Sequence, residues 1–144
     1  MLDLLFVYGS LMSEVPSAAS RWLRQHSSLI AKDSLPGHLY DLGRYPGLVM
    51  EENKPALVYG EIHRLYKPAE ALRYLDEYEG TAMANPEYER IVCQTMQQRN
   101  CWVYQYLPTD HSLPRIQGGD YYTFYPTNSR HLTFISRKDA STAN

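Results

Sequence analysis

Short apolar segments separated by turn residues recur along most of this sequence, and only two stretches have the periodicity of a helix. The strand-like segments lie at about 2–8, 28–33, 37–42, 57–66, 88–96 and 101–107. The turn signals are Pro36-Gly37, Tyr45-Pro46-Gly47, Asn53-Lys54-Pro55 and Leu107-Pro108. The helical patterns cover about 15–25 and 68–79. Many short strands with few helices predict an α+β domain built on a curved sheet or small barrel.

A chain of 144 residues is long enough for one domain with a sizeable core. We expect this domain over residues 1–135, with 131–135 docking as a short strand, and a polar, frayed tail over 136–144. The 14 Lys and Arg against 16 Asp and Glu give a net charge of −2, which predicts binding to neither nucleic acid nor an anionic membrane. No apolar stretch approaches the roughly 20 residues of a membrane span. The N-terminal apolar run is typical of a core strand rather than a signal peptide.

Cysteine and histidine usage gives no pattern for a metal site. Cys93 and Cys101 are too few for zinc; they could pair across neighbouring strands, but buried free thiols in a reducing cytosol are the favoured interpretation. The five histidines are scattered, without a His-x3-His pair, so we expect no metal and no cofactor. The 13 tyrosines suit a half-wet cavity, where the ring packs and the hydroxyl forms hydrogen bonds.

The first apolar run ends on Tyr8-Gly9-Ser10-Leu11, where a buried strand gives way to a turn. Gly9 is expected to allow a backbone turn that a side chain would hinder. A helix follows, with Ser13 or Ser17 as its N-cap. Successive N–H groups at such a turn can face an anion. On these residues alone, a purely structural turn is the favoured interpretation.

Glu79 is an unexpected residue in the second helical pattern. On a helical wheel Leu72 and Leu75 define the apolar stripe, and Glu79 falls between them. Burial and the helix C-terminus both disfavour its anion, so both should raise its pKa toward that of a general acid–base catalyst. The alternative is a helix that ends one turn earlier, with Glu79 as a cap or paired with Arg90. Asp76, at the edge of the stripe, is expected to cap or orient another group.

Later motifs are weaker, and other chemistries fail on spacing. Tyr88 and Arg90 share a face of the strand that opens at 88, as a surface pair would. The segment Gln117-Gly-Gly-Asp-Tyr-Tyr122 fits a plain turn. Gly9-Ser-Leu-Met-Ser13 is not the Gly-x-Ser-x-Gly elbow of hydrolases. No glycine-rich nucleotide-binding motif occurs.

Taken in order, these motifs resemble those of the gamma-glutamylcyclotransferase-like (AIG2-like) family. The match consists of Val-Tyr-Gly-Ser-Leu, Gly43-Arg-Tyr-Pro-Gly47, Val58-Tyr-Gly-Glu-Ile62, a helix ending Leu-Asp-x-x-Glu-Gly, a Tyr-x-Arg strand and Gly119-Asp-Tyr121. It spans about residues 4–122. The resemblance implies a small mixed or antiparallel β-barrel flanked by a few helices, with a cavity at one end.

The resemblance also implies roles for individual residues. Glu79 would be the catalytic acid/base, while Tyr8, Gly9, Ser10 and Leu11 would bind the substrate and Tyr88 would line the pocket. The implied substrate is a small γ-glutamyl amine, which cyclises to 5-oxoproline and releases a free amine without metal or cofactor. A binding module that keeps the loop and cavity but has no turnover is the alternative. The leaving amine and the oligomeric state cannot be deduced from the sequence.

Overall fold

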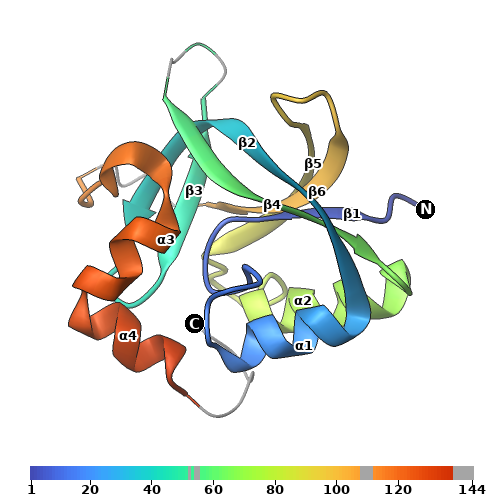
Figure 1. The fold of residues 1–144 in the computed structure, drawn as a ribbon, viewed down its shortest axis with the longest axis horizontal. Coiled ribbons are helices and arrows are strands. Elements are labelled where there is room, and N and C mark those ends of the chain that lie inside the picture. Colours follow the sequence, from blue (N-terminus) through green and yellow to red (C-terminus); the bar gives the residue numbers. More distant parts are fainter. Residues whose placement is uncertain (52, 54–55, 108–111, 138–144) are drawn as a thin grey trace.

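Six strands form one curved sheet in the computed structural model, which describes residues 1–51, 53, 56–107 and 112–137. The strand order in this part of the chain is β3-β2-β4-β1-β6-β5. Neighbouring strands are antiparallel except β1 and β6, which run parallel. The expected α+β fold with a mixed barrel is therefore confirmed (Figure 1). The strands are β1 (Leu4–Val7), β2 (Ser27–Asp41), β3 (Pro46–Met50), β4 (Leu57–Leu65), β5 (Tyr88–Gln94) and β6 (Asn100–Tyr106).

The long strand β2 replaces two predicted strands, and the predicted turn at Pro36-Gly37 is wrong. Residues Ser27 to Pro36 pair with β4, and from Gly37 onward the strand pairs with β3. Proline has no N–H to donate, so it fits the last position of a ladder. A Cβ on Gly37 would lie 2.4 Å from the carbonyl oxygen of Val49, so the close approach of β3 requires glycine. The turn signal marks a change of partner within one continuous strand.

Side chains rather than a strand ladder close the barrel between β3 and the β5–β6 hairpin. The Tyr8 hydroxyl donates to the carbonyl of Tyr104 on β6 at 2.7 Å and accepts from the amide of Leu48 on β3 at 3.3 Å. The Tyr88 hydroxyl donates to the carbonyl of Pro46 at 2.7 Å. The Met50 amide donates to Oε1 of Gln105 at 2.9 Å. We call these bridges, made by Tyr8, Tyr88 and Gln105, the seam.

The predicted turn at 45–47 is wrong, because Pro46 begins β3. The sequence did not predict this strand. The tight connection comes earlier, where the amide of Leu42 donates to the carbonyl of Tyr45 at 3.0 Å. Asp41 and Pro46 are the first partners of the β2–β3 ladder. Proline is tolerated as the first residue of an edge strand, which is the place it occupies here.

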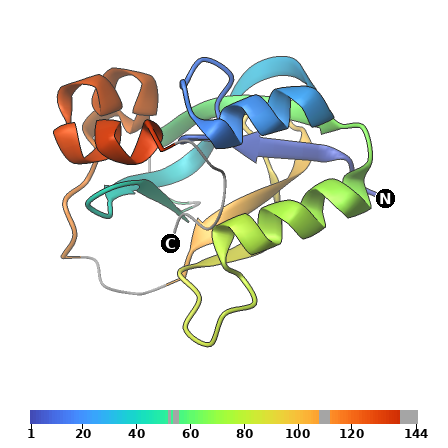
Figure 2. The same ribbon diagram turned by 90° about the horizontal axis from the view of Figure 1, so that it is seen from below.

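Two helices lie side by side against one face of the barrel (Figure 2). Helix α1 (Ala18–His26) begins at Ser17, whose hydroxyl accepts from the amide of Ser20 at 3.0 Å. Helix α2 (Pro68–Glu79) has the predicted bounds. The rings of Trp22 on α1 and Tyr74 on α2 stack with centroids 3.9 Å apart. Apolar residues from both helices and from the strands form one continuous core.

The C-terminal helices lie to one side of α1 and α2, next to β3 (Figures 1 and 2). They are α3 (Tyr121–Phe124) and α4 (Ser129–Ile135), preceded by short 3-10 turns at Gln117–Gly119 and Tyr125–Thr127. The predicted strand at 131–135 is therefore wrong. His131, Phe134 and Ile135 are the buried residues of α4, which is helical spacing, and Asn128 caps the helix. Of the predicted tail, residues 138–144 lie outside the described part of the chain.

The predictions about the cysteines, membrane spans and two further turns can also be compared with the structure. Cys93 and Cys101 are free, buried thiols directly opposite each other on β5 and β6, with their sulfur atoms 3.5 Å apart. Within the described residues, no helix has the length and apolarity needed to cross a membrane. The predicted turns at 53–55 and 107–108 include residues 54, 55 and 108, which lie outside the described part of the chain.

Candidate functional site

A cavity at the end of β1 brings together all six residues singled out in the sequence, namely Tyr8, Gly9, Ser10, Leu11, Glu79 and Tyr88. The loop of residues 8–11 and the C-terminal end of α2 meet there, although 68 positions separate Leu11 from Glu79. Aromatic side chains form much of the remaining wall. The other lining residues are Phe6, Val7, Tyr45, Pro46, Tyr78, Tyr104 and Phe134.

Hydrogen bonds from α1 and within the loop itself fix the loop that follows β1. The amide of Met12 donates to the carbonyl of Gly9 at 3.0 Å, closing a turn. The hydroxyl of Ser17 donates to the carbonyl of Ser10 at 2.6 Å, and that of Ser20 donates to the carbonyl of Met12 at 2.8 Å. Of the two candidate caps, Ser17 therefore both begins α1 and holds the loop.

The reason for glycine at position 9 differs from the expected one. Its φ angle is not positive, so the turn itself does not demand glycine. A Cβ placed there would lie 2.8 Å from Cγ of Pro46 across the cavity wall. The close packing of the loop against the start of β3 therefore excludes a side chain at Gly9.

Glu79 is the last residue of α2, as the helical wheel predicted, and the alternative in which the helix ends one turn earlier is wrong. Leu72 and Leu75 are buried on the same face. Gly80 ends the helix in a left-handed conformation with φ 71°, and its amide donates to the carbonyls of Asp76 and Glu77. Glu79 retains a partly accessible surface, and its side chain lines the cavity.

The environment of Glu79 favours its neutral form. Burial, and secondly the nearby carboxylate of Glu87, raises the pKa of Glu79 to about 8. Burial was expected, but Glu87, in the loop after α2, was not among the candidates. Glu87 is held in place by the Tyr45 hydroxyl, which donates to it at 2.6 Å. A carboxyl with a pKa near neutrality can both accept and return a proton.

Arg90 does not pair with Glu79 but with Asp76, one turn earlier on α2. Its guanidinium donates to both carboxylate oxygens of Asp76, at 2.8 and 3.1 Å. The Tyr104 hydroxyl donates to the same carboxylate at 2.7 Å. Asp76 therefore orients two side chains of the hairpin, in the role expected of it. Its pairing raises the pKa of Arg90 above its ordinary value.

Tyrosine supplies five of the cavity-lining residues, which are Tyr8, Tyr45, Tyr78, Tyr88 and Tyr104. Burial raises the pKa of all five above its ordinary value, so the phenols stay neutral at physiological pH. The hydroxyls of Tyr8 and Tyr88 serve the seam, and that of Tyr78 lies 3.3 Å from the hydroxyl of Ser10. The tyrosine-rich composition thus does point to this cavity.

Several lining residues were not predicted. Tyr45 and Pro46 lie in the Gly-Arg-Tyr-Pro-Gly motif, which served only as a mark of resemblance. Tyr78 precedes Glu79 and could have been placed near the site by that adjacency. Phe134 comes from α4, which was predicted as a strand, so no signal in the sequence placed it at the cavity.

Residues 5–123 match the family model described as "Gamma-glutamyl cyclotransferase, AIG2-like". A Vibrio cholerae protein named "Putative gamma-glutamylcyclotransferase" is 32% identical over 123 residues, covering 84% of this chain and 96% of that one.

Two solved structures of similar length share the fold. The solution structure of the protein ytfP from Escherichia coli is 30% identical, with a TM-score of 0.59, covering 82% of this chain and 95% of that chain. The crystal structure of an AIG2-like protein from Mus musculus is 23% identical, with a TM-score of 0.63, covering 83% and 88%.

Proposed function

This chain belongs to the gamma-glutamyl cyclotransferase, AIG2-like family, and from that premise we propose that it converts a γ-glutamyl amine into 5-oxoproline and a free amine. The single observation that carries the proposal is the placement of Glu79. A carboxyl with a pKa of about 8 lines a cavity together with the loop of residues 8–11. The family match supports a γ-glutamyl substrate, and the meeting of Glu79 and the loop in one cavity supports a proton carrier next to a binding loop.

The substrate contains its own nucleophile. In a γ-glutamyl amine the α-nitrogen attacks the γ-carbonyl carbon, and a new C–N bond closes a five-membered ring. The bond from that carbon to the leaving nitrogen then breaks. Holding the two ends together makes the reaction intramolecular, an effect worth ~7–11 kcal/mol of the barrier in favourable cases. The aromatic wall of the cavity would hold the folded substrate.

Two proton transfers accompany the bond changes, and Glu79 can perform both. The α-nitrogen attacks as the neutral amine and loses one proton as the ring closes, and the leaving nitrogen gains one proton to depart as a neutral amine. The carboxylate of Glu79 accepts the first proton and its acid form delivers the second, so the enzyme returns to its starting state. A pKa of about 8 makes neither transfer steeply uphill.

The loop after β1 would bind the polar parts of the substrate. Gly9, Ser10 and Leu11 of this loop line the cavity. We assign the N–H groups of this loop to the α-carboxylate or to the oxygen that becomes negative as the ring closes. The seam already uses the hydroxyls of Tyr8 and Tyr88, so these two residues contribute their rings to the site.

The test is turnover of a panel of γ-glutamyl amines, with 5-oxoproline as the measured product. The panel contains γ-glutamyl amino acids, glutathione and an isopeptide-linked γ-glutamyl lysine. We expect release of 5-oxoproline from at least one member. Glu79→Gln should lower its kcat by about 10²–10⁴-fold, because the shape is kept and the proton carrier is lost.

A matched control lies on the same helix. Glu77 is exposed, two residues before Glu79, and Glu77→Gln should leave turnover unchanged. Activity of Glu79→Gln within a few-fold of the unmodified protein would end the assignment of Glu79. Binding of a panel member without any release of 5-oxoproline would instead support the alternative, a non-catalytic binding module.

A further inference from the structure

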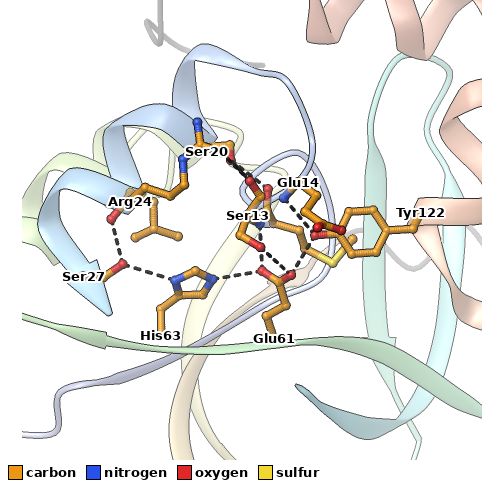
Figure 3. Close-up of polar contacts among 10 residues, drawn as sticks. Ser13, Glu14, Ser20, Arg24, Ser27, Glu61, His63 and Tyr122 are labelled. Atoms are coloured by element: carbon orange, nitrogen blue, oxygen red, sulfur yellow. Dashed lines mark hydrogen bonds and ion pairs between the residues drawn. The ribbon is translucent and has the colours of Figure 1, made fainter. Parts of the chain in front are cut away.

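Glu61 on β4 is one of the most buried charged residues in the described part of the chain, with 2% of its surface exposed, yet it lies outside the cavity that holds Glu79. Its carboxylate accepts four hydrogen bonds (Figure 3). The donors are the Ser13 amide at 2.8 Å, the Ser13 hydroxyl at 2.9 Å, the Tyr122 hydroxyl at 2.7 Å and Nε2 of His63 at 3.0 Å.

The carboxyl of Glu61 is ionised under all ordinary conditions. Burial opposes ionisation, but the hydrogen bonds from His63, Tyr122 and Ser13 outweigh it and hold the pKa of Glu61 at about 2. An ionised carboxylate only accepts hydrogen bonds, so Nε2 of His63 carries the proton it shares with Glu61. On its other side His63 contacts the hydroxyl of Ser27 at 3.2 Å, where α1 meets β2.

The position of Ser13 makes this network relevant to the cavity. Ser13 immediately follows the turn closed by Gly9 and Met12, and it donates two of the four hydrogen bonds that Glu61 accepts. Serines of α1 hold the loop at the carbonyls of Ser10 and Met12. The loop is thus fixed from α1 on one side and from β4 on the other.

Tyr122 brings the C-terminal segment into the same network. Its hydroxyl donates to Glu61 and accepts from the amide of Glu14 at 3.0 Å. Figure 3 shows Tyr122 reaching Glu61 from the side opposite His63, with Ser13 between them. This tyrosine belongs to the Gly-Gly-Asp-Tyr-Tyr segment, to which the proposed proton transfers by Glu79 assign no role.

We propose that Glu61 is a positioning residue, which together with His63 and Tyr122 fixes Ser13 and thereby holds the backbone of Gly9, Ser10 and Leu11 in the shape that binds substrate. The consequence for turnover rests on the proposed function; the consequence for the shape of the loop does not. Glu61 acts through the loop and touches no reacting atom.

The test compares Glu61→Gln and Tyr122→Phe with a control, Tyr66→Phe. Glutamine keeps the shape of Glu61 but offers one acceptor atom where the carboxylate offers two, so it cannot serve all four donors. Tyr122→Phe removes the phenol hydroxyl alone. The hydroxyl of Tyr66 contacts that of Ser28 at 2.9 Å on an exposed surface, so Tyr66→Phe removes a comparable contact remote from the loop.

Two readouts are measured on each variant. Amide hydrogen exchange by NMR should be faster by about tenfold or more at Met12, whose amide closes the loop on the Gly9 carbonyl, in Glu61→Gln and Tyr122→Phe, and unchanged in Tyr66→Phe. With the γ-glutamyl amine that is turned over, KM should rise and kcat/KM should fall by about tenfold or more. The acid limb of the pH profile should stay in place, because Glu79 is untouched.

Exchange at Met12 that matches the unmodified protein in both variants would overturn the proposal, even if Ser13 itself exchanged faster. If Glu61→Gln does not fold, Tyr122→Phe decides the question alone, because it keeps the ring and the carboxylate. If the unmodified protein releases no 5-oxoproline from any amine, the proposed function fails, and the exchange data still decide whether Glu61 holds the loop.

Discussion

Ionising Glu79 costs stability, because its pKa is about 8 in the folded chain and near 4.5 in an exposed carboxyl. When folding raises the pKa of a carboxyl, the free energy of unfolding falls as the pH rises above the unfolded pKa. The loss is complete above the folded pKa. The free energy of unfolding should therefore fall as pH rises from about 4.5 through 8. Glu79→Gln removes this penalty and should stabilise the protein at pH 8 and above by on the order of 2–4 kcal/mol.

Urea denaturation at pH 4 and pH 9 measures this effect without any assay of turnover. The difference between Glu79→Gln and the unmodified protein should be small at pH 4 and large at pH 9. A difference of the same size at both values would mean that the carboxyl keeps an ordinary pKa, and Glu79 would then be unsuited to the proposed proton transfers.

Glu87 offers a second prediction on the same carboxyl. Its negative charge raises the pKa of Glu79, so Glu87→Gln should lower that pKa and move the acid limb of kcat/KM to lower pH. A glutamine oxygen can still accept the bond from Tyr45. Glu89, which binds Gln105 instead, provides the control, and Glu89→Gln should leave the limb where it is. A limb that moves equally in both variants would indicate a general change of charge.

At the residue scale, a pattern within one helix was enough to place Glu79. Its position depends only on the helical period and on Leu72 and Leu75, which are near it in sequence. Glu87 could not be found in this way, because it meets Glu79 through the path of a loop. The pairing of Arg90 with Asp76 rather than Glu79 likewise depends on how β5 lies against α2, which no local pattern fixes.

At the scale of elements, the seam makes a prediction about stability. Tyr8→Phe removes a hydroxyl that donates to Tyr104 and accepts from Leu48. Both backbone groups are buried, so leaving them without that partner should lower the free energy of unfolding by about 1–3 kcal/mol. Thermal denaturation measures the loss. Tyr59→Phe is the control, because Tyr59 is half-exposed on β4, and it should change the stability little.

The sequence predicted where helices and strands lie better than it predicted which strands pair with each other. Helix α2 has its expected bounds because Pro68 and Gly80 are strong signals for the two ends of a helix. Turn signals were less reliable, since Pro36-Gly37 lies within β2 and Pro46 begins β3. In both cases proline fits a ladder position that needs no N–H, which a prediction of turns alone cannot distinguish. In 131–135, five residues were too few to separate the spacing of a strand from that of a helix.

For the molecule as a whole, the C-terminal segment is part of the site. His131 is buried and its Nε2 lies 2.7 Å from the carboxylate of Asp41 on β2. Phe134 lines the cavity and Ile135 packs into the core. Each buried side chain of this kind contributes about 1.5–3 kcal/mol. A chain that ends at Asn128 should therefore melt at a clearly lower temperature and should lose turnover.

A chain that ends at Arg137 is the control for this truncation, since it retains every contact described for α4. Calorimetry and the 5-oxoproline assay should find it equal to the full chain. Equal melting temperatures for the chains ending at Asn128 and at Arg137 would mean that α4 is an accessory to the barrel rather than part of it.

The seam has a consequence for behaviour at high concentration. The strands β3 and β5 are the two edges of the sheet, and an unprotected edge is a template for pairing with another chain. At the β3 edge, the side chains of the seam occupy three backbone groups. Tyr8 accepts from the Leu48 amide, Tyr88 donates to the Pro46 carbonyl and Gln105 accepts from the Met50 amide. Tyr8 and Tyr88, which line the cavity, thus also occupy backbone groups that could pair with another chain. Loosening them for a larger substrate would therefore carry a risk of aggregation.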